Sequence, residues 1–542
     1  MGKFEKKPPK KKINKGFAIA LAAILVLAAA AAVWMFANYH IVSWRLYPRN
    51  AEFLDLRERE LTTVQYDKIR QKLPDCEIRW NIPFQGGKLE DDAQEITVST
   101  LTEADVAQLA YAHQLKRVHA EVCTDYEALE LLRQSRPELE VLYTVAFSGG
   151  NHSWDVDTLR LNSVTAEDIG LLKHLPRLEV VALEAGNHDS GVVASLREAV
   201  KNAGMAFGVV IGGQILEDTE AEREIVGITE AELGLPEHLS MLRKLTLVDP
   251  DAPAEALLAL ESRIPQAELN WKVTFGDLAY DRTATQADLT MVEITDLSLT
   301  ERKLASLPDL EQVTFGLCGV DDPEWGNSKS VLAASAIENE DMAAYRDRVR
   351  GDYKVVWTVR LGPVIALRTD AHNFMPTHFN IGRLPDSHAY NLRYCEDMVC
   401  LDVGHMTLTD ISFVSFMPRL KYLILAWTGV QYIEPIRACK ELIFLELDNS
   451  PIRDISPLVD CTALQDLNLG NTGCDITPLK EMHWLKNVYM IHRGSAGIVG
   501  MALPDTRVVG SDNPKAVTVG FGWRKLPNYY AMRDMLNMPY MD

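Results

Sequence analysis

Apolar residues recur every 22 positions near the C-terminal end of the chain. Each of four segments fits the pattern L-x-x-L-x-L, namely MVCLDV (398–403), LKYLIL (420–425), LIFLEL (442–447) and LQDLNL (464–469), and LKNVYM (485–490) follows after 21 residues. One such unit cannot bury its own apolar side, whereas stacked units share a continuous core. The pattern therefore predicts stacked coils, each with a short strand whose side chains alternate between the core and the outside.

This period and spacing are those of a leucine-rich repeat. The run IRDISPLVDCTALQDLNLGNT (452–472) closely resembles the internalin-like class of bacterial leucine-rich repeats, and the resemblance covers residues 398–492. It departs from that class where Met406, Thr428, Ser450 and Thr472 replace the usual ladder asparagine, although the three hydroxyls can still bond the backbone of the turn. The resemblance implies a protein-binding solenoid of a bacterial cell surface.

A longer and weaker repeat precedes the regular one. LPDCEIRWNIPFQGG (73–87) resembles RPELEVLYTVAFSGG (136–150), which lies 63 residues further on. LTEADVAQLAYAHQLKRV (101–118) and VTAEDIGLLKHLPRLEVV (164–181) keep the same step, and a later copy, LTDISFVSFMPRLKYL (408–423), lies inside the regular repeats. We therefore expect an α/β leucine-rich repeat solenoid of irregular long repeats followed by regular 22-residue repeats. The 110-residue step from Leu310 to Leu420 predicts an insertion that includes a helix within 330–350 and a loop around 364–390.

These patterns divide the chain into seven parts. They are a basic cytoplasmic tail (1–16), a transmembrane anchor (17–38), a juxtamembrane linker or helix (39–70), a divergent solenoid (71–363), an insertion loop (364–392), regular repeats (393–492) and a C-terminal cap (493–542). The last part leaves the repeat, is rich in aromatic residues and predicts a short amphipathic helix around 528–537. Its alternative role is a tail that docks a partner.

A single membrane segment is predicted near the N-terminus. Residues 17–37 are 21 uncharged, apolar residues, enough to span a bilayer core of about 30 Å as a helix. Seven lysines and one acid, Glu5, precede them, and this excess of positive charge places the N-terminus in the cytoplasm. We expect a single-pass protein with its C-terminal domain outside the cell. A cleaved signal peptide is the alternative, since small residues at 28–32 offer a cleavage site.

The net charge of the chain argues against one class of partner, and the positions of its cysteines predict their state. The whole chain carries a net charge of −21, and without its basic tail the charge is −27, which argues against a nucleic-acid partner. The chain has eight cysteines and no C-x-x-C motif. Cys439 and Cys461 occupy the same position of adjacent coils, so we predict buried core thiols, and a disulfide between them stays open as an alternative.

No catalytic motif is found in the sequence. It lacks G-x-x-x-x-G-K-[ST], G-x-S-x-G and H-E-x-x-H. The stretch 370–388 contains Asp370, His372, His378, Asp386 and His388, but their spacing matches no metal-ligand pattern. TEAD (102–105) and TAED (165–168) are typical of helix starts. We therefore predict no catalytic residue, metal or cofactor. The alternative is an enzyme that acts on envelope glycan, and its activity would depend on Asp370 or His372.

The outward positions of the predicted strands are the best candidates for partner binding. They mix aromatic side chains, which interface cores favour, with acidic and amide side chains. The predicted contacts on this concave face are Tyr422, Trp427, Phe444, Glu446, Asp448, Asp466, Asn468 and Tyr489. A protein partner is expected there. The second hypothesis is a structural scaffold that assembles envelope proteins through its alanine-rich membrane helix or its C-terminal cap.

Overall fold

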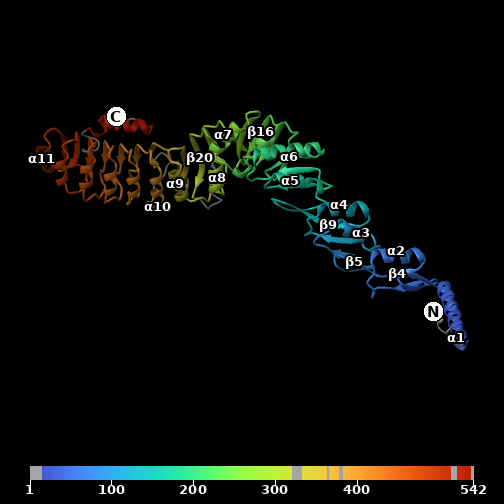
Figure 1. Ribbon diagram of the computed structural model, residues 1–542. Coiled ribbons are helices and arrows are strands. Elements are labelled where there is room, and N and C mark those ends of the chain that lie inside the picture. The colour runs from blue at the N-terminus through green and yellow to red at the C-terminus, as the bar shows by residue number, and fades with distance from the viewer. Residues whose placement is uncertain (1–14, 320–332, 363–364, 377–382, 514–521, 539–542) are drawn as a thin grey trace, which may run out of the picture. The chain divides into compact units, whose positions relative to one another are not determined.

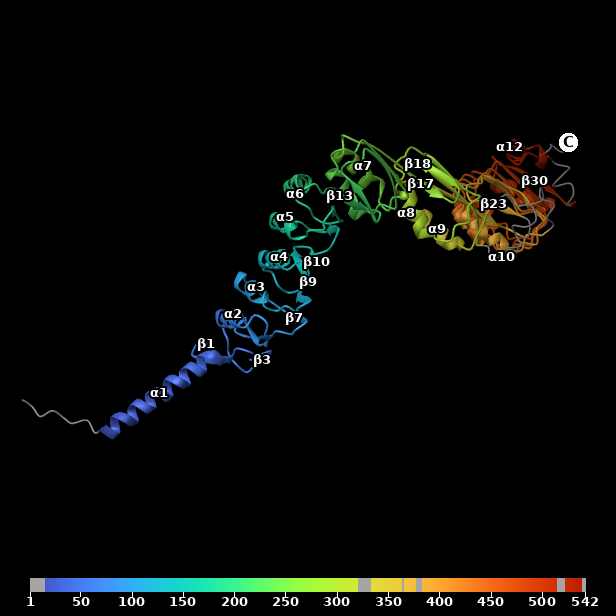
Figure 2. The same ribbon diagram turned by 90° about the vertical axis from the view of Figure 1, so that its right-hand side faces the viewer.

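The computed structural model describes residues 15–319, 333–362, 365–376, 383–513 and 522–538. The chain forms two compact units (Figures 1 and 2). The first comprises residues 1–219 and 234–241, and the second comprises residues 220–233 and 242–542.

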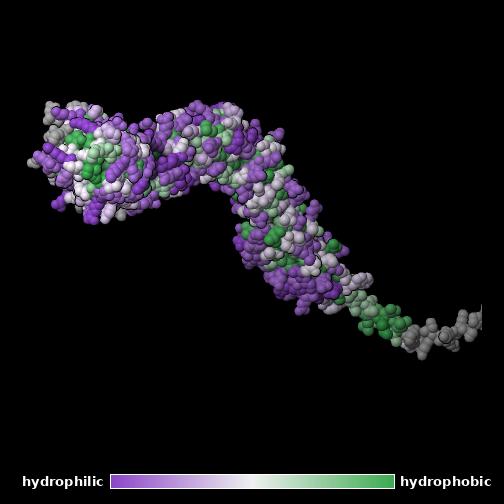
Figure 3. Space-filling model, turned by 90° about the vertical axis from the view of Figure 1, so that its left-hand side faces the viewer, coloured by the Kyte–Doolittle hydropathy of each residue, from purple (hydrophilic) through white to green (hydrophobic). Residues whose placement is uncertain are grey.

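The first unit begins with the predicted apolar helix, α1 (Lys15–Asn38). Its stretch Ile19–Asn38 is long and apolar enough to cross a membrane and is left unburied by the described residues, and Figure 3 shows it as a hydrophobic segment. The hairpin of β1 (Tyr39–Val42) and β2 (Arg45–Pro48) follows, with the exposed Trp44 at its tip. A signal sequence has the same properties as this helix, so both readings of the segment agree with the fold.

The rest of the first unit repeats one motif: parallel strands alternate with helices, and the last strand turns back as an antiparallel hairpin. The early copy pairs β3 (Phe53–Asp55) with β4 (Glu77–Arg79) and adds the hairpin of β5 (Asn81–Phe84) and β6 (Gly87–Glu90). Two four-stranded sheets follow: β7 (Glu95–Thr97), β8 (Arg117–Ala120), β9 (Glu140–Phe147) and β10 (Gly150–Ser153); then β11 (Thr158–Leu161), β12 (Val180–Leu183), β13 (Ala206–Ile211) and β14 (Gln214–Glu217). The intervening helices are α2 (Thr63–Lys72), α3 (Glu103–Leu109), α4 (Tyr126–Ser135), α5 (Ala166–Leu171) and α6 (Ser190–Asn202).

The second unit continues the motif with two further sheets. They are β15 (Glu222–Val226), β16 (Lys244–Val248), β17 (Glu268–Phe275) and β18 (Leu278–Asp281), and β19 (Gln286–Leu289), β20 (Gln312–Cys318), β22 (Lys354–Arg360) and β23 (Ala366–Arg368), with β21 (Ala334–Ser335) beside β20. Their helices are α7 (Ala254–Arg263), α8 (Leu297–Ala305) and α9 (Asn339–Arg348). The four complete sheets start at residues 95, 158, 222 and 286, which explains the 63-residue step of the sequence as one sheet per step.

Part of the predicted insertion belongs to the repeat. Helix α9 connects β20 to β22 in the place that α7 takes between β16 and β17, so it is the ordinary crossover helix of a parallel strand pair. The segment 364–392 likewise contributes β23, β24 (Asn373–Phe374) and α10 (Asp386–Ala389). Residues 39–70 also hold more than a linker, because β3 and α2 already follow the motif. The spacing of apolar residues did not reveal β3, β23 and β24, because each of these strands is only two or three residues long.

The regular repeats form a seven-stranded, all-parallel sheet. It runs through β24, β25 (Cys400–Asp402), β26 (Tyr422–Ile424), β27 (Phe444–Glu446), β28 (Asp466–Leu469), β29 (Asn487–Ile491) and β30 (Arg507–Ser511). Leu401, Leu423, Leu445, Leu467 and Val488 are paired across it and are fully buried, as the ladder predicts. Short 3-10 turns return the chain: η5 (Tyr390–Tyr394), η6 (Ser412–Phe416), η7 (Glu434–Ala438), η8 (Ser456–Asp460) and η9 (Thr477–Glu481).

Local polar contacts agree with the sequence interpretation. The Thr428 hydroxyl donates to the carbonyl oxygen of Leu425 at 2.8 Å, and the Ser450 hydroxyl donates to the same oxygen at 2.6 Å. Thr102 and Thr165 cap α3 and α5 with complete capping boxes. All eight cysteines lie in described ranges and are free, and Cys439 and Cys461 are buried thiols that donate to backbone carbonyls.

The C-terminal part of the chain forms a last coil and a segment that packs on the sheet. Helix α11 (Arg493–Ala502) and strand β30 add a last coil to the sheet, as expected of a cap. The turn η11 (Trp523–Lys525) and helix α12 (Pro527–Met535) instead pack against the outward side of the sheet, where both Figure 1 and Figure 2 show the C-terminal helix beside the stacked strands. We call residues 522–538 the covering segment.

Candidate functional site on the outward face of the C-terminal sheet

The C-terminal sheet separates two apolar clusters. The inward one contains the leucine ladder, while the outward one is made by alternate residues of the same strands together with the covering segment. The members of the outward cluster are Met375, Cys400, Tyr422, Ile424, Ala426, Phe444, Tyr489, Trp523, Leu526, Tyr529, Met532 and Leu536. The predicted outward direction of the strand residues is thus correct, but a part of the same chain lies over them.

Aromatic rings hold the covering segment on the sheet. The ring of Trp523 stacks on Phe444 with centroids 4.6 Å apart and meets Tyr489 edge-on at 5.2 Å. Tyr529 lies 6.3 Å from Phe444 by the same measure. Trp523, Phe444 and Tyr489 are all fully buried. Gly522, at φ +90°, provides the left-handed turn that leads into Trp523.

Polar side chains complete the contact. The Asp466 carboxylate accepts one hydrogen bond from Asn528 Nδ2 at 2.9 Å and another from Asn487 Nδ2 at 2.7 Å. Arg533 is buried and donates to the Tyr529 hydroxyl at 3.1 Å. The segment therefore presents both aromatic and hydrogen-bonding groups to the face.

Three carboxyl groups on this face hold protons unusually tightly. Burial raises the pKa of Asp402 to about 6, that of Glu446 to about 7 and that of Asp448 to about 6. The positive charge of Arg533 opposes the shift at Asp402, and that of Arg524 opposes it at the other two. Burial thus shifts these carboxyl groups toward the neutral form, which predominates only below about pH 6 for Asp402 and Asp448 and below about pH 7 for Glu446.

One edge of the face stays open. A residue two or three positions after each of β25, β26, β27 and β28 adopts a left-handed backbone, at φ +62°, +60°, +56° and +53° for His405, Trp427, Asn449 and Asn471. Trp427 is 56% exposed and stacks on His405 at 5.9 Å between ring centroids. Asn471 Nδ2 donates to Asn449 Oδ1 at 2.7 Å, and Tyr432, 71% exposed, follows in the Trp427 coil. We call His405, Trp427, Asn449 and Asn471 the turn row.

The eight predicted contacts divide between these two places. Trp427 lies in the exposed turn row. The other seven are buried or half-buried on the outward side, namely Tyr422, Phe444, Glu446, Asp448, Asp466, Asn468 and Tyr489. The predicted amphipathic helix around 528–537 was the signal for their cover, but the sequence gives no contact between segments so far apart.

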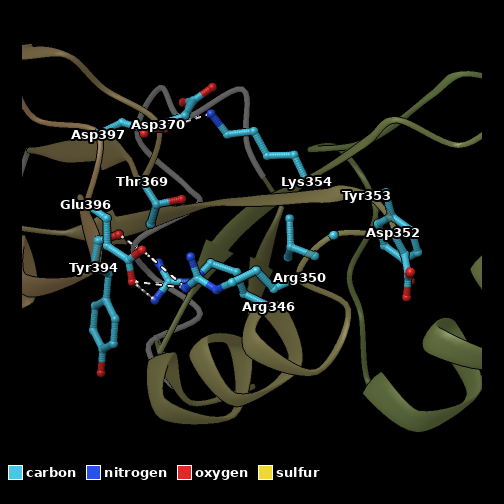
Figure 4. Close-up of a pocket in the computed structure, with 12 residues that line it drawn as sticks. Arg346, Arg350, Asp352, Tyr353, Lys354, Thr369, Asp370, Tyr394, Glu396 and Asp397 are labelled. Atoms are coloured by element: carbon cyan, nitrogen blue, oxygen red, sulfur yellow. Dashed lines mark hydrogen bonds and ion pairs between the residues drawn. The ribbon is translucent and has the colours of Figure 1, made fainter. Parts of the chain in front are cut away.

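A charged pocket of about 440 Å³ lies beside the first regular coils (Figure 4). Its charges are paired: Glu396 contacts both Arg346 and Arg350, and Asp397 accepts from Lys354 at 2.7 Å. Asp397 also pairs with Arg419 at 3.0 Å. These pairs connect the β22 region with the following coils.

The pocket offers little for acid–base chemistry. Burial alone would raise the pKa of Asp370, but its bidentate hydrogen bonds with Arg368 hold that pKa below the usual value. His372 Nδ1 lies 3.0 Å from the backbone oxygen of Asp397. His378 lies outside the described residues. Among the residues that are described, no group of three His, Cys, Asp or Glu side chains gathers into a metal site.

Comparisons with known proteins add three resemblances in fold. An internalin from Listeria monocytogenes is 12% identical over 79% of this chain and 90% of its own, with a TM-score of 0.20. A leucine-rich repeat protein of Leptospira interrogans is 12% identical over 86% and 90%, with a TM-score of 0.17. The leucine-rich repeat ectodomain of a plant membrane receptor kinase from Arabidopsis thaliana is 10% identical over 76% and 48%, with a TM-score of 0.20.

No family model and no curated protein matches the chain. At TM-scores this low the superpositions carry no weight, so the assignment rests on the repeat itself. The 22-residue period, the buried leucine ladder and the in-register parallel strands are the features that define the architecture. The chain folds as a leucine-rich repeat solenoid, and its regular coils resemble those of the internalin-like class.

Proposed function

We propose that the chain is a non-catalytic, membrane-anchored protein that binds a protein partner through its leucine-rich repeats on the outer side of a bacterial membrane. Three features of the first residues support the anchor. The apolar stretch of α1 is left unburied by the described residues, seven lysines precede residues 17–37, and exposed Trp44 follows the helix at a hairpin tip, where tryptophan suits the membrane–water interface.

The turn row is the proposed binding surface, because it is exposed to solvent in this structure. Trp427 is exposed and is stacked on His405, and the exposed Tyr432 follows in the same coil. A large ring held by a stacking neighbour offers contact area at a small cost in conformational entropy, which is typical of interface anchors. The exposed tryptophan at a regular turn of the solenoid is the observation that carries this proposal.

Replacing Trp427 should separate binding from folding. We expect Trp427→Ala to weaken partner binding at least tenfold and to leave thermal stability unchanged, because the side chain is exposed. A photoreactive amino acid at position 427 of the full chain, expressed in cells, should give one discrete protein adduct. External protease should digest that adduct if the repeats lie outside the membrane.

The matched control is the same amino acid at position 416. Phe416 is also a large exposed side chain, but it lies in the η6 turn rather than in the turn row. Equal adducts from both positions, or full binding by Trp427→Ala, would remove the turn row from the proposal. An adduct that resists external protease would contradict display outside the membrane.

A further inference from the structure

The covering segment has the pattern of a helical ligand. Its buried and exposed positions alternate along one helix: Tyr529 and Met532 are 5% and 1% exposed, whereas their neighbours Tyr530 and Met535 are 37% and 38% exposed. With Trp523, the buried side chains form an apolar stripe that fits a face made of Tyr422, Phe444 and Tyr489. Helix-in-groove recognition uses this spacing of anchors.

The charges of the two surfaces are complementary. The face contributes the carboxyl groups of Asp402, Glu446, Asp448 and Asp466, and the segment brings Arg524 and Arg533 toward them. Asn528 adds a direct hydrogen bond to Asp466. An occupant of this face is therefore favoured if it combines aromatic anchors with a basic residue.

The fit of the segment is incomplete. Within the described residues, Asp448 Oδ1 and Asn468 Nδ2 are buried without a hydrogen-bond partner. Each such group costs free energy that a better-matched ligand would recover. Helix α12 has nine residues, too few for a stable helix in isolation, so the segment loses its helix when it leaves the face. Both facts indicate that another ligand can displace the segment from the face.

We propose that the outward face is an acceptor groove for an amphipathic helix of a partner protein, one with aromatic anchors and a basic residue, and that the covering segment occupies the groove until such a helix displaces it. A competitor can bind only when the groove is open. Its apparent affinity is therefore its intrinsic affinity multiplied by the fraction of molecules in which the groove is open. The groove and the turn row are different surfaces. An experiment can therefore disprove binding at one of them without disproving binding at the other.

The test uses a fluorescent peptide with the sequence of residues 522–538 and the full chain in detergent. Tyr529→Ala with Met532→Ala removes two buried anchors of the resident segment, and Tyr530→Ala with Met535→Ala makes the same changes at exposed positions of the same helix. We expect the peptide to bind the first variant at least tenfold more tightly than the second. Adding Phe444→Ala to the first variant should reduce the binding again, because it removes the floor of the groove.

Charge is tested in the peptide rather than in the chain. A peptide with Arg533→Glu should bind the first variant at least tenfold more weakly, since it brings a negative charge to Asp402. Equal binding of the unchanged peptide to both variants, or none to the first while its repeats remain folded, would overturn the groove. Concentration-dependent dimers of the wild-type chain that exchange the segment would overturn the partner helix in favour of a second copy.

Discussion

Trp523→Ala releases the covering segment while the repeats stay folded. The ring is fully buried against Phe444 and Tyr489, and removing a buried tryptophan costs about 3–5 kcal/mol. Since 1.4 kcal/mol corresponds to a factor of ten, the open state gains at least a hundredfold in population. Trypsin should then cleave after Lys525 and Arg533 about a hundredfold faster, because cleavage of a transiently open segment follows the population of the open state.

Trp427→Ala is the control, because it removes a tryptophan of the same sheet that is already exposed. It should leave the cleavage rate at Lys525 and Arg533 unchanged. Unaltered cleavage in Trp523→Ala would mean that the ring does not hold the segment. Simultaneous cleavage within residues 400–490 would mean that the outward cluster is part of the core on which the solenoid depends.

The covering segment should be held more tightly at pH 5.5 than at pH 8. The covered face raises the pKa of Glu446 from 4.5 to about 7 and those of Asp402 and Asp448 to about 6. The covered state therefore binds more protons than the open state, and its stabilisation is complete below about pH 4 and is lost as the pH rises through 6 to 7. We expect the hydrogen-exchange protection of α12, corrected for intrinsic rates, to fall at least tenfold between the two pH values.

Neutral amides should remove this dependence. In Glu446→Gln with Asp448→Asn, protection of α12 at pH 8 should rise above that of the wild type, because no buried carboxylate has to ionise. Glu441→Gln makes the same kind of change at an exposed position of that coil and should keep the wild-type profile. A profile in the double variant as steep as in the wild type would assign the pH dependence to other groups.

Much of the fold follows from the spacing of apolar residues. Leu401, Leu423, Leu445 and Leu467 are one ladder because a coil must meet its neighbour in register, and this requirement is visible as a 22-residue period. The same reasoning gave the 63-residue step. It did not reveal that each step is one sheet closed by an antiparallel strand, although the turn of the β9–β10 hairpin lies within the repeated segment 136–150.

Less of the candidate site could be predicted from the sequence. Period two alone gives the direction of Tyr422 and Phe444, since alternate residues of a strand point to opposite sides. The segment that covers them is held by contacts between residues far apart in the sequence, such as Asn528 with Asp466. Such contacts are not visible in the local pattern of apolar and polar residues. The exposed state of Trp427 also depends on the left-handed turn that follows its strand.

Hydroxyl-radical footprinting of the full-length chain tests the covered face most directly, because mass spectrometry then reports the solvent exposure of each aromatic side chain. The structure predicts weak modification of Tyr422, Phe444, Tyr489 and Trp523 and strong modification of Trp427 and Tyr432 in the same sample. Modification of the first four at rates close to that of Trp427 would show that the face is open and would contradict the account.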